Sequence, residues 1–147
     1  MSLVLKPMGK ITVIPTNQYE VACGPVGKRT ATELRSVTWE CSLFNATSRW
    51  ANGTYLAGTT GIAEPEIRIM FETDRGEFLY VEYIARIDLA KHASGKVPGP
   101  LSTGRVETDA ERLLWLNETA IVGDGLFTIG KNSMSMVYSV YALDRVD

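Results

Sequence analysis

The chain has 147 residues and carries 15 basic against 17 acidic side chains, for a formal net charge of −2 at neutral pH. It therefore lacks the excess of positive charge with which proteins bind nucleic acids or anionic membranes, and we expect neither partner. Hydrophobic residues make up 45% of the chain and charged residues 22%, which are ordinary proportions for a soluble globular protein. This length suits one domain with a real core, so we expect a single domain over residues 1–147.

The few cysteine and histidine residues argue against a disulfide framework and a metal site. Cys23 and Cys41 are the only cysteines, and their spacing fits two buried thiols in a reducing compartment. His92 is the only histidine, so a metal site is not expected. No nucleotide-binding motif occurs, no apolar run is long enough to span a bilayer, and the first residues, "MSLVLKPMGKITV", lack a secretory signal. We therefore expect a cytoplasmic protein without a cofactor.

The N-terminal part of the chain is rich in strand signals. Strands are predicted at residues 10–15 and 19–23, separated by a turn at Pro-Thr-Asn, and residues 30–48 suit one bent strand or two. The cluster "GPVG" between these strands predicts a turn. Asn52-Gly53 is the strongest short signal for a hairpin, so another turn is expected there.

The stretch "EIRIMFETDRGEFLYVEYIARID", residues 66–88, predicts a regular β-hairpin. Asp74-Arg75-Gly76 forms the turn, with Gly76 in the left-handed conformation that such a loop requires. This register places only apolar pairs on one face, and a shift by one residue would set apolar side chains against charged ones. The pairs of the apolar face are Phe71–Leu79, Ile69–Val81 and Ile67–Tyr83, and those of the mixed face are Glu72–Phe78, Met70–Tyr80, Arg68–Glu82 and Glu66–Ile84.

The remainder of the chain predicts a loop, one helix and two strands. The segment "LAKHASGKVPGPLSTG" is typical of a loop with one helical turn before Gly95. Thr108 and Glu111 match the two ends of a capping box, which predicts a short helix near 109–117. "ETAIVG" and "SMSMVYSVYAL" (133–143) return to strand patterns. Many short strands with one short helix predict an all-β fold, a single antiparallel β-barrel.

Three stretches of the chain resemble a known protein family. They are "EIRIMFETDRGEFLYVEY", "GRVETDAERLLWLNETAIVGDG" and the closing "VYSVYAL". Each is similar to motifs of the uncharacterised family called domain of unknown function 3237, with its acidic-x-Arg pair at Glu66 and Arg68. The chain departs from the family pattern at "SRWANGTY", where members often carry an acidic residue. The resemblance covers the chain from roughly Gly9 onward. It implies a small β-barrel and no established reaction.

Two interpretations of the mixed hairpin face follow from the sequence. Its charged residues either lie on a solvated surface, where ion pairs contribute about 0–1 kcal/mol each, or line the barrel interior beside a ligand. We expect the interior arrangement, with Arg68 and Glu82 as a buried, hydrogen-bonded pair. The apolar face would then point outward and need a cover, so a packed helix or a homo-oligomer is predicted. The candidate ligand-binding residues are Glu66, Arg68, Tyr80, Glu82, Arg86, Trp50 and Arg105.

These residues lead us to expect a protein that binds an unidentified small molecule. Its carboxylates and arginines suit cofactor-independent acid–base chemistry of the isomerase, dehydratase or cyclase type, and whether the protein is an enzyme stays open. The alternative is a non-catalytic oligomeric interaction or carrier module. Such a module would use the faces of the 66–88 hairpin, with Met70, Phe78, Tyr80 and Ile84 at the contact.

Overall fold

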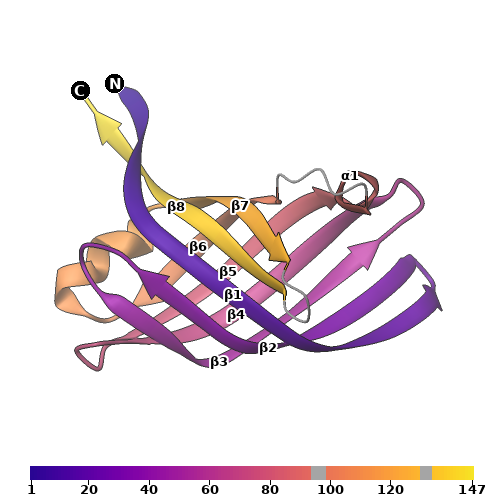
Figure 1. The fold of residues 1–147 in the computed structure, drawn as a ribbon. Coiled ribbons are helices and arrows are strands. Elements are labelled where there is room, and N and C mark those ends of the chain that lie inside the picture. The colour runs from indigo at the N-terminus through magenta and orange to yellow at the C-terminus, as the bar shows by residue number, and fades with distance from the viewer. Residues whose placement is uncertain (94–98, 130–133) are drawn as a thin grey trace.

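Eight antiparallel strands close into one barrel in the computed structural model, which describes residues 1–93, 99–129 and 134–147. Each strand pairs with the next along the chain, and β8 pairs with β1 to close the ring (Figure 1). The predicted all-β barrel is therefore confirmed. The strands are β1 (Ser2–Gly24), β2 (Gly27–Glu40), β3 (Asn45–Ala57), β4 (Ile62–Thr73), β5 (Phe78–Asp88), β6 (Leu101–Thr108), β7 (Ile121–Ile129) and β8 (Met134–Val146).

Two short helices complete the described elements. The α-helix α1 (Leu89–Ala93) follows β5, and the 3-10 helix η1 (Glu111–Glu118) joins β6 to β7. The helix predicted near 109–117 is confirmed as η1. The helical turn expected after the hairpin corresponds to α1, although Gly95 itself lies outside the described residues. Within the described ranges, neither helix has the length and hydrophobicity that crossing a membrane would require.

The predicted capping box at the start of η1 is wrong. The N-cap residue is Ala110, and it makes no side-chain cap hydrogen bond. Thr108 instead ends β6, where its hydroxyl donates to the carbonyl oxygen of Phe78 on β5 at 2.8 Å. The amide of Asn117 holds both backbone groups of Thr108, accepting its N–H at 2.8 Å and donating to its carbonyl oxygen at 2.9 Å. The last turn of η1 is thus tied to the end of β6.

The hairpin of β4 and β5 has the predicted turn and register. The Thr73 N–H donates to the Glu77 carbonyl oxygen at 2.8 Å, and the Gly76 N–H donates back to Thr73 at 3.0 Å. Gly76 adopts a φ of 77°, the left-handed conformation that the turn needs. Every cross-strand pair predicted for the two faces occurs.

The apolar face of this hairpin lines the barrel interior, and the mixed face points to solvent. Ile69 and Val81 are fully buried, whereas the side chains of Arg68 and Glu82 are 59% and 30% exposed. The predicted inward, buried Arg68–Glu82 pair is therefore wrong. Burial of the apolar face removes much apolar surface from water, whereas a buried ion pair must first lose its hydration. With this face inside, the cover expected from a helix or a second subunit is not needed.

β1 and β3 run through two of the predicted turns. Asn52-Gly53 lies within β3, where Gly53 leaves room for an isoleucine of β4, so close packing rather than a turn explains the glycine. β1 continues through the predicted Pro-Thr-Asn turn, and its register with β2 shifts on both sides of Pro15, as in a β-bulge. The predicted "GPVG" turn is confirmed between β1 and β2.

Cys23 is exposed and Cys41 partly buried, so the expectation of two buried thiols is wrong.

The two ends of the barrel differ in how they are filled. Figure 1 shows η1 (orange) and α1 at opposite ends. At the η1 end, Trp39 packs on Phe44 and Phe71 with ring centroids 5.0 Å and 5.9 Å apart, together with two buried leucines of η1. The Trp39 indole donates to the carbonyl oxygen of Met8 at 2.7 Å. We call this the filled end, and the α1 end, which contains a cavity, the hollow end.

Candidate functional site

The hollow end of the barrel contains a cavity of about 290 Å³ that is open to solvent, since Gln18 and Met134 in its lining are exposed. β1 to β5, α1, β7 and β8 all contribute to its wall. Strand alternation positions these side chains: on β2, Thr32 and Leu34 turn inward while Glu33 and Arg35 are exposed. The apolar part of the wall includes Val13, Leu34, Ile67, Ile87, Phe127 and Met136.

Few polar groups border the cavity. They are the side chains of Gln18, Thr32, Tyr55 and Ser135, and the Gln18 amide donates to the Thr32 hydroxyl at 3.4 Å. None of the described residues around the cavity is charged. A charged ligand would therefore lose its hydration without gaining an ion-pair partner. This lining suits a small uncharged molecule with one or two polar groups.

Three buried hydroxyl groups, those of Thr30, Tyr83 and Tyr138, have no hydrogen-bond partner in the part of the chain that the structure describes. The two tyrosine rings meet edge to face, with centroids 5.4 Å apart. Burial raises the pKa of Tyr83 well above its ordinary value, and Tyr138 raises that pKa further. Burial also raises the pKa of Tyr138 to about 12. The two hydroxyls lie close enough to shift each other's pKa, raising that of Tyr83 and lowering that of Tyr138, although their geometry is not that of a regular hydrogen bond, and both are protonated at neutral pH.

Four of the predicted ligand-binding residues meet on the outer wall. The Tyr80 hydroxyl donates to Oε1 of Glu82 at 2.7 Å, and Nη2 of Arg105 donates to Oε2 at 2.8 Å. Nε of Arg68 lies 3.8 Å from Oε1 of the same carboxylate. The hydrogen bond from Tyr80, and then that from Arg105, lowers the pKa of Glu82. Because the two arginine side chains are 59% and 68% exposed, solvent screens this cluster, as the solvated-surface interpretation predicts.

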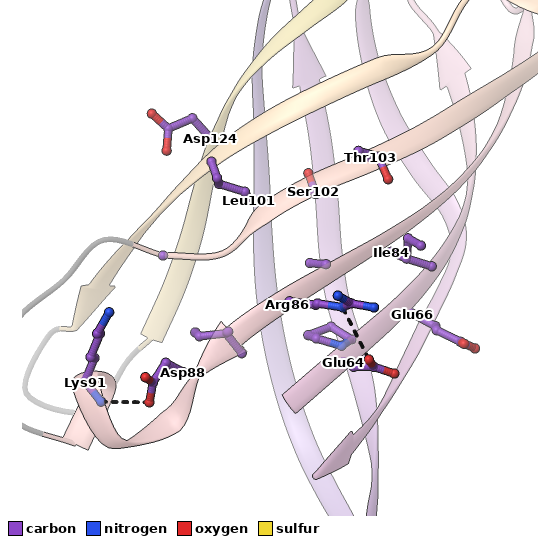
Figure 2. Close-up of a pocket in the computed structure, with 14 residues that line it drawn as sticks. Glu64, Glu66, Ile84, Arg86, Asp88, Lys91, Leu101, Ser102, Thr103 and Asp124 are labelled. Atoms are coloured by element: carbon purple, nitrogen blue, oxygen red, sulfur yellow. Dashed lines mark hydrogen bonds and ion pairs between the residues drawn. The ribbon is translucent and has the colours of Figure 1, made fainter. Parts of the chain in front are cut away.

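The other three predicted residues lie apart from this cluster. Trp50 is 48% exposed on β3. Glu66 and Arg86 border an open outer groove of about 710 Å³, in which Nε of Arg86 lies 3.3 Å from Oε1 of Glu64 (Figure 2). Asp88 in the same groove accepts two backbone N–H groups at the start of α1. Across residues 1–93, 99–129 and 134–147, no group of three or more histidine, cysteine or acidic side chains is placed to hold a metal ion.

Sequence reasoning predicted a ligand site in the barrel interior but missed the residues that line this cavity. Its wall brings together residues that are far apart along the chain, such as Val13, Leu34 and Phe127. Alternation in β2 was an available signal for the inward direction of individual side chains. It does not show which layer of a barrel core is left unfilled, because that depends on how side chains from opposite walls meet.

A family of proteins of unknown function, DUF3237, matches the chain over residues 3–143. The chain belongs to the DUF3237 family. No curated protein matches this DUF3237 sequence.

Solved structures share the fold of this DUF3237 protein. A β-barrel-like protein from Acinetobacter baumannii AYE has a TM-score of 0.79 at 23% identity, with 98% of each chain covered. A conserved protein of unknown function from Rhodopseudomonas palustris has a TM-score of 0.82 at 17% identity, with 98% of this chain and 99% of that chain covered. A structure described as an enzyme from Penicillium herquei has a TM-score of 0.71 at 12% identity, with 98% and 96% covered. At these identities the likeness establishes the barrel fold.

Proposed function

We propose that this DUF3237 protein binds a small, uncharged and largely apolar molecule inside the hollow end of its barrel. The observation that carries the proposal is the cavity of about 290 Å³, with its apolar wall and few polar groups. An eight-stranded barrel is just wide enough to hold one small ligand. Pockets for drug-sized molecules begin at about 300 Å³, so a ligand of one or two fused rings matches this space.

A more specific version of this proposal is that the protein also catalyses a reaction of the bound molecule. A protein of the same fold is described as an enzyme from Penicillium herquei, which supports a catalytic use of such a barrel. The isomerase, dehydratase or cyclase chemistry that we predicted relied on carboxylates and arginines, and these groups lie on the outer wall. A reaction among the described cavity residues would have to use hydroxyl and amide groups instead. Binding is therefore the function that the geometry supports best.

The second candidate is a non-catalytic, homo-oligomeric interaction module. Its supporting observation is that single apolar side chains are exposed on the outer wall: Phe78 at 48%, Ile84 at 58% and Leu101 at 72%. Apolar surface of this kind suits contact with a second copy of the chain. Sedimentation equilibrium tests this candidate: an oligomer that dissociates upon Ile84→Lys supports it, and a wild-type monomer at every concentration contradicts it.

Leu34→Trp tests ligand binding in the cavity, because the larger ring would occupy the space that a ligand needs. Arg35→Trp is the matched control, since Arg35 is the next residue on β2 and is exposed. The probe is 2-ethylnaphthalene, which has two fused rings and no charge. We expect fluorescence titration to show saturable binding to the wild type and the control. The affinity of Leu34→Trp for the probe should be lower by at least about tenfold. Equal binding to all three proteins, or no binding to the wild type, would overturn the proposal.

A further inference from the structure

The lining of the cavity changes in character between its buried and its exposed parts. The buried residues of the described lining are Val13, Ala63 and Ile67, and all of them are apolar. The polar side chains of the lining are instead exposed or partly exposed. The cavity therefore has an apolar inner part, and its polar groups lie where solvent also reaches.

Three of the polar groups are neighbours on adjacent strands. Gln18 on β1 is the cross-strand partner of Thr32 on β2, and its amide donates to the Thr32 hydroxyl at 3.4 Å. Tyr55 on β3 is the cross-strand partner of Thr30, so it is diagonal to Thr32 and within reach of it. We call Gln18, Thr32 and Tyr55 the polar rim. The described lining residues of β4, β5 and α1 are all apolar, so the polar groups are gathered on one side of the cavity.

The polar rim offers donors to an oxygen atom of a ligand. Because the Thr32 hydroxyl accepts from Gln18, its own proton is available for donation. Tyr55 is partly exposed and supplies a second hydroxyl. A ligand oxygen placed against Val13 or Ile67 would instead lose its hydration without gaining a donor. An oxygen-bearing ligand is thus bound best with that oxygen at the rim.

Beyond the polar rim, the same face of the sheet becomes charged. Alternate residues of a strand share a face, so Glu20 continues the line from Gln18, and Lys28 that from Thr32. Both lie nearer than the rim to the β1–β2 connection, which projects at the hollow end (Figure 1). Nζ of Lys28 is 3.0 Å from Oε1 of Glu20, and the side chains are 43% and 45% exposed. A substituent that leaves the rim in this direction crosses a hydrated surface.

We propose that the polar rim binds the oxygen-bearing end of a neutral amphipathic ligand, such as an aromatic ketone or ester, whose hydrocarbon body occupies the apolar inner part of the cavity. The inference rests on the proposed function and narrows it in two ways. The ligand has its hydrogen-bonding group at one end, and this end is held toward the opening. That end can therefore carry a further polar substituent into solvent, whereas the opposite end cannot.

The first test measures the contribution of the rim hydroxyls. The probes 2-acetylnaphthalene and 2-ethylnaphthalene share a ring system and differ by the carbonyl group. The measured quantity is the ratio of their dissociation constants in the wild type, Thr32→Val and Tyr55→Phe. Thr38→Val is the matched control, because Thr38 lies on the same strand outside the cavity lining. We expect the preference for the ketone to fall by about three- to tenfold in at least one rim variant, with the affinity for 2-ethylnaphthalene unchanged.

The second test determines which end of the ligand faces the opening. Two derivatives of methyl 2-naphthoate carry the same triethylene glycol chain, one through the ester and the other through an ether at the far end of the ring system. The ester-linked chain should leave the affinity of the wild type within about threefold of that for methyl 2-naphthoate. The ether-linked chain should lower it by at least about tenfold, because the chain would have to enter the apolar inner part.

The outcomes separate this inference from the proposed function. A ketone preference that is the same in all four proteins, or equal affinities for the two glycol derivatives, would overturn the inference while leaving cavity binding intact. If neither 2-acetylnaphthalene nor 2-ethylnaphthalene binds the wild type, the proposed function fails and the inference fails with it.

Discussion

The filled and hollow ends of this barrel belong to the same closed sheet but differ in how far their side chains fill the interior. At the filled end, Trp39 and Phe71 are fully buried against each other and against η1. At the hollow end, Val13 and Leu34 occupy inward positions of the first two strands, and a cavity of about 290 Å³ remains between the walls. Large, interlocking side chains thus fill one end of the barrel, whereas the other end leaves room for a ligand.

A polar clamp holds η1 on the filled end. Nη2 of Arg112 lies 2.6 Å from Oε1 of Glu77, and Nε lies 2.9 Å from Oε2, so the guanidinium engages both carboxylate oxygens. Nη1 donates to the carbonyl oxygen of Leu43 at 2.6 Å. Bidentate contacts of this type are among the stronger hydrogen bonds in proteins. The clamp joins η1 to the end of the β4–β5 hairpin and to the β2–β3 connection.

The largest expected difference between the two ends is in the response to leucine truncation. Leu113→Ala at the filled end should lower the free energy of unfolding by about 3–5 kcal/mol, because a fully buried leucine leaves a new cavity behind. Leu34→Ala should cost about 2 kcal/mol or less, because Leu34 already borders a cavity and is only partly buried. Urea denaturation of both variants measures the contrast, and equal losses would show that the hollow end is as tightly packed as the filled end.

Replacing a valine by phenylalanine should destabilise the protein more at the filled end than at the hollow end. Val37→Phe, at a fully buried position outside the cavity wall, should lower the free energy of unfolding by about 1–3 kcal/mol through overpacking. Val13→Phe can place its ring in the cavity, so we expect a change of less than about 1 kcal/mol. Denaturation without added ligand measures both variants. A larger loss for Val13→Phe than for Val37→Phe would contradict the assignment of the hollow end.

The clamp at the filled end should give the protein a pH dependence at low pH. The hydrogen bonds from Arg112 lower the pKa of Glu77 from its ordinary 4.5 to about 2 in the folded protein. The unfolded chain therefore binds the proton more readily, so the stabilisation by Glu77 is complete above pH 4.5 and is lost as pH falls through 2.

Glu77→Gln isolates this effect. The difference in unfolding free energy between wild type and variant should be constant near neutral pH and shrink between pH 4.5 and pH 2. Glu64→Gln is the control at the hollow end, where the ion pair with Arg86 has both side chains more than half exposed and contributes little. A difference for Glu77→Gln that stays constant down to pH 2 would contradict the clamp.

The sequence predicted the barrel and the β4–β5 hairpin because both depend on local patterns. The alternation of Ile67, Ile69 and Phe71 and the left-handed Gly76 determine the register within one stretch of chain. The inward or outward direction of each face could not be read from the same pattern, because both faces carry apolar side chains. The mixed face includes Met70 on β4, and only closure of the ring shows which face is enclosed.

The candidate site was less predictable than the fold. The outer cluster around Glu82 was found because opposite charges on paired strands are visible in the sequence. The cavity wall combines strands such as β1, β2, β5 and β8, which lie far apart in the chain. The turn predicted at Asn52-Gly53 was wrong for the same reason. Gly53 accommodates a side chain of β4, and the local sequence does not reveal this contact.

The smallest expected effect concerns the Arg68–Glu82 pair on the outer wall. Because its side chains are 59% and 30% exposed, solvent screens their attraction and replaces it when either is removed. Arg68→Ala, Glu82→Ala and the double variant should each stay close to the wild-type free energy of unfolding. Their coupling should be near the precision of chemical denaturation, and added salt should reduce it further. A large coupling that resists salt would mean that this wall is buried in solution, and the outer face would then be a contact between copies of the chain rather than free surface.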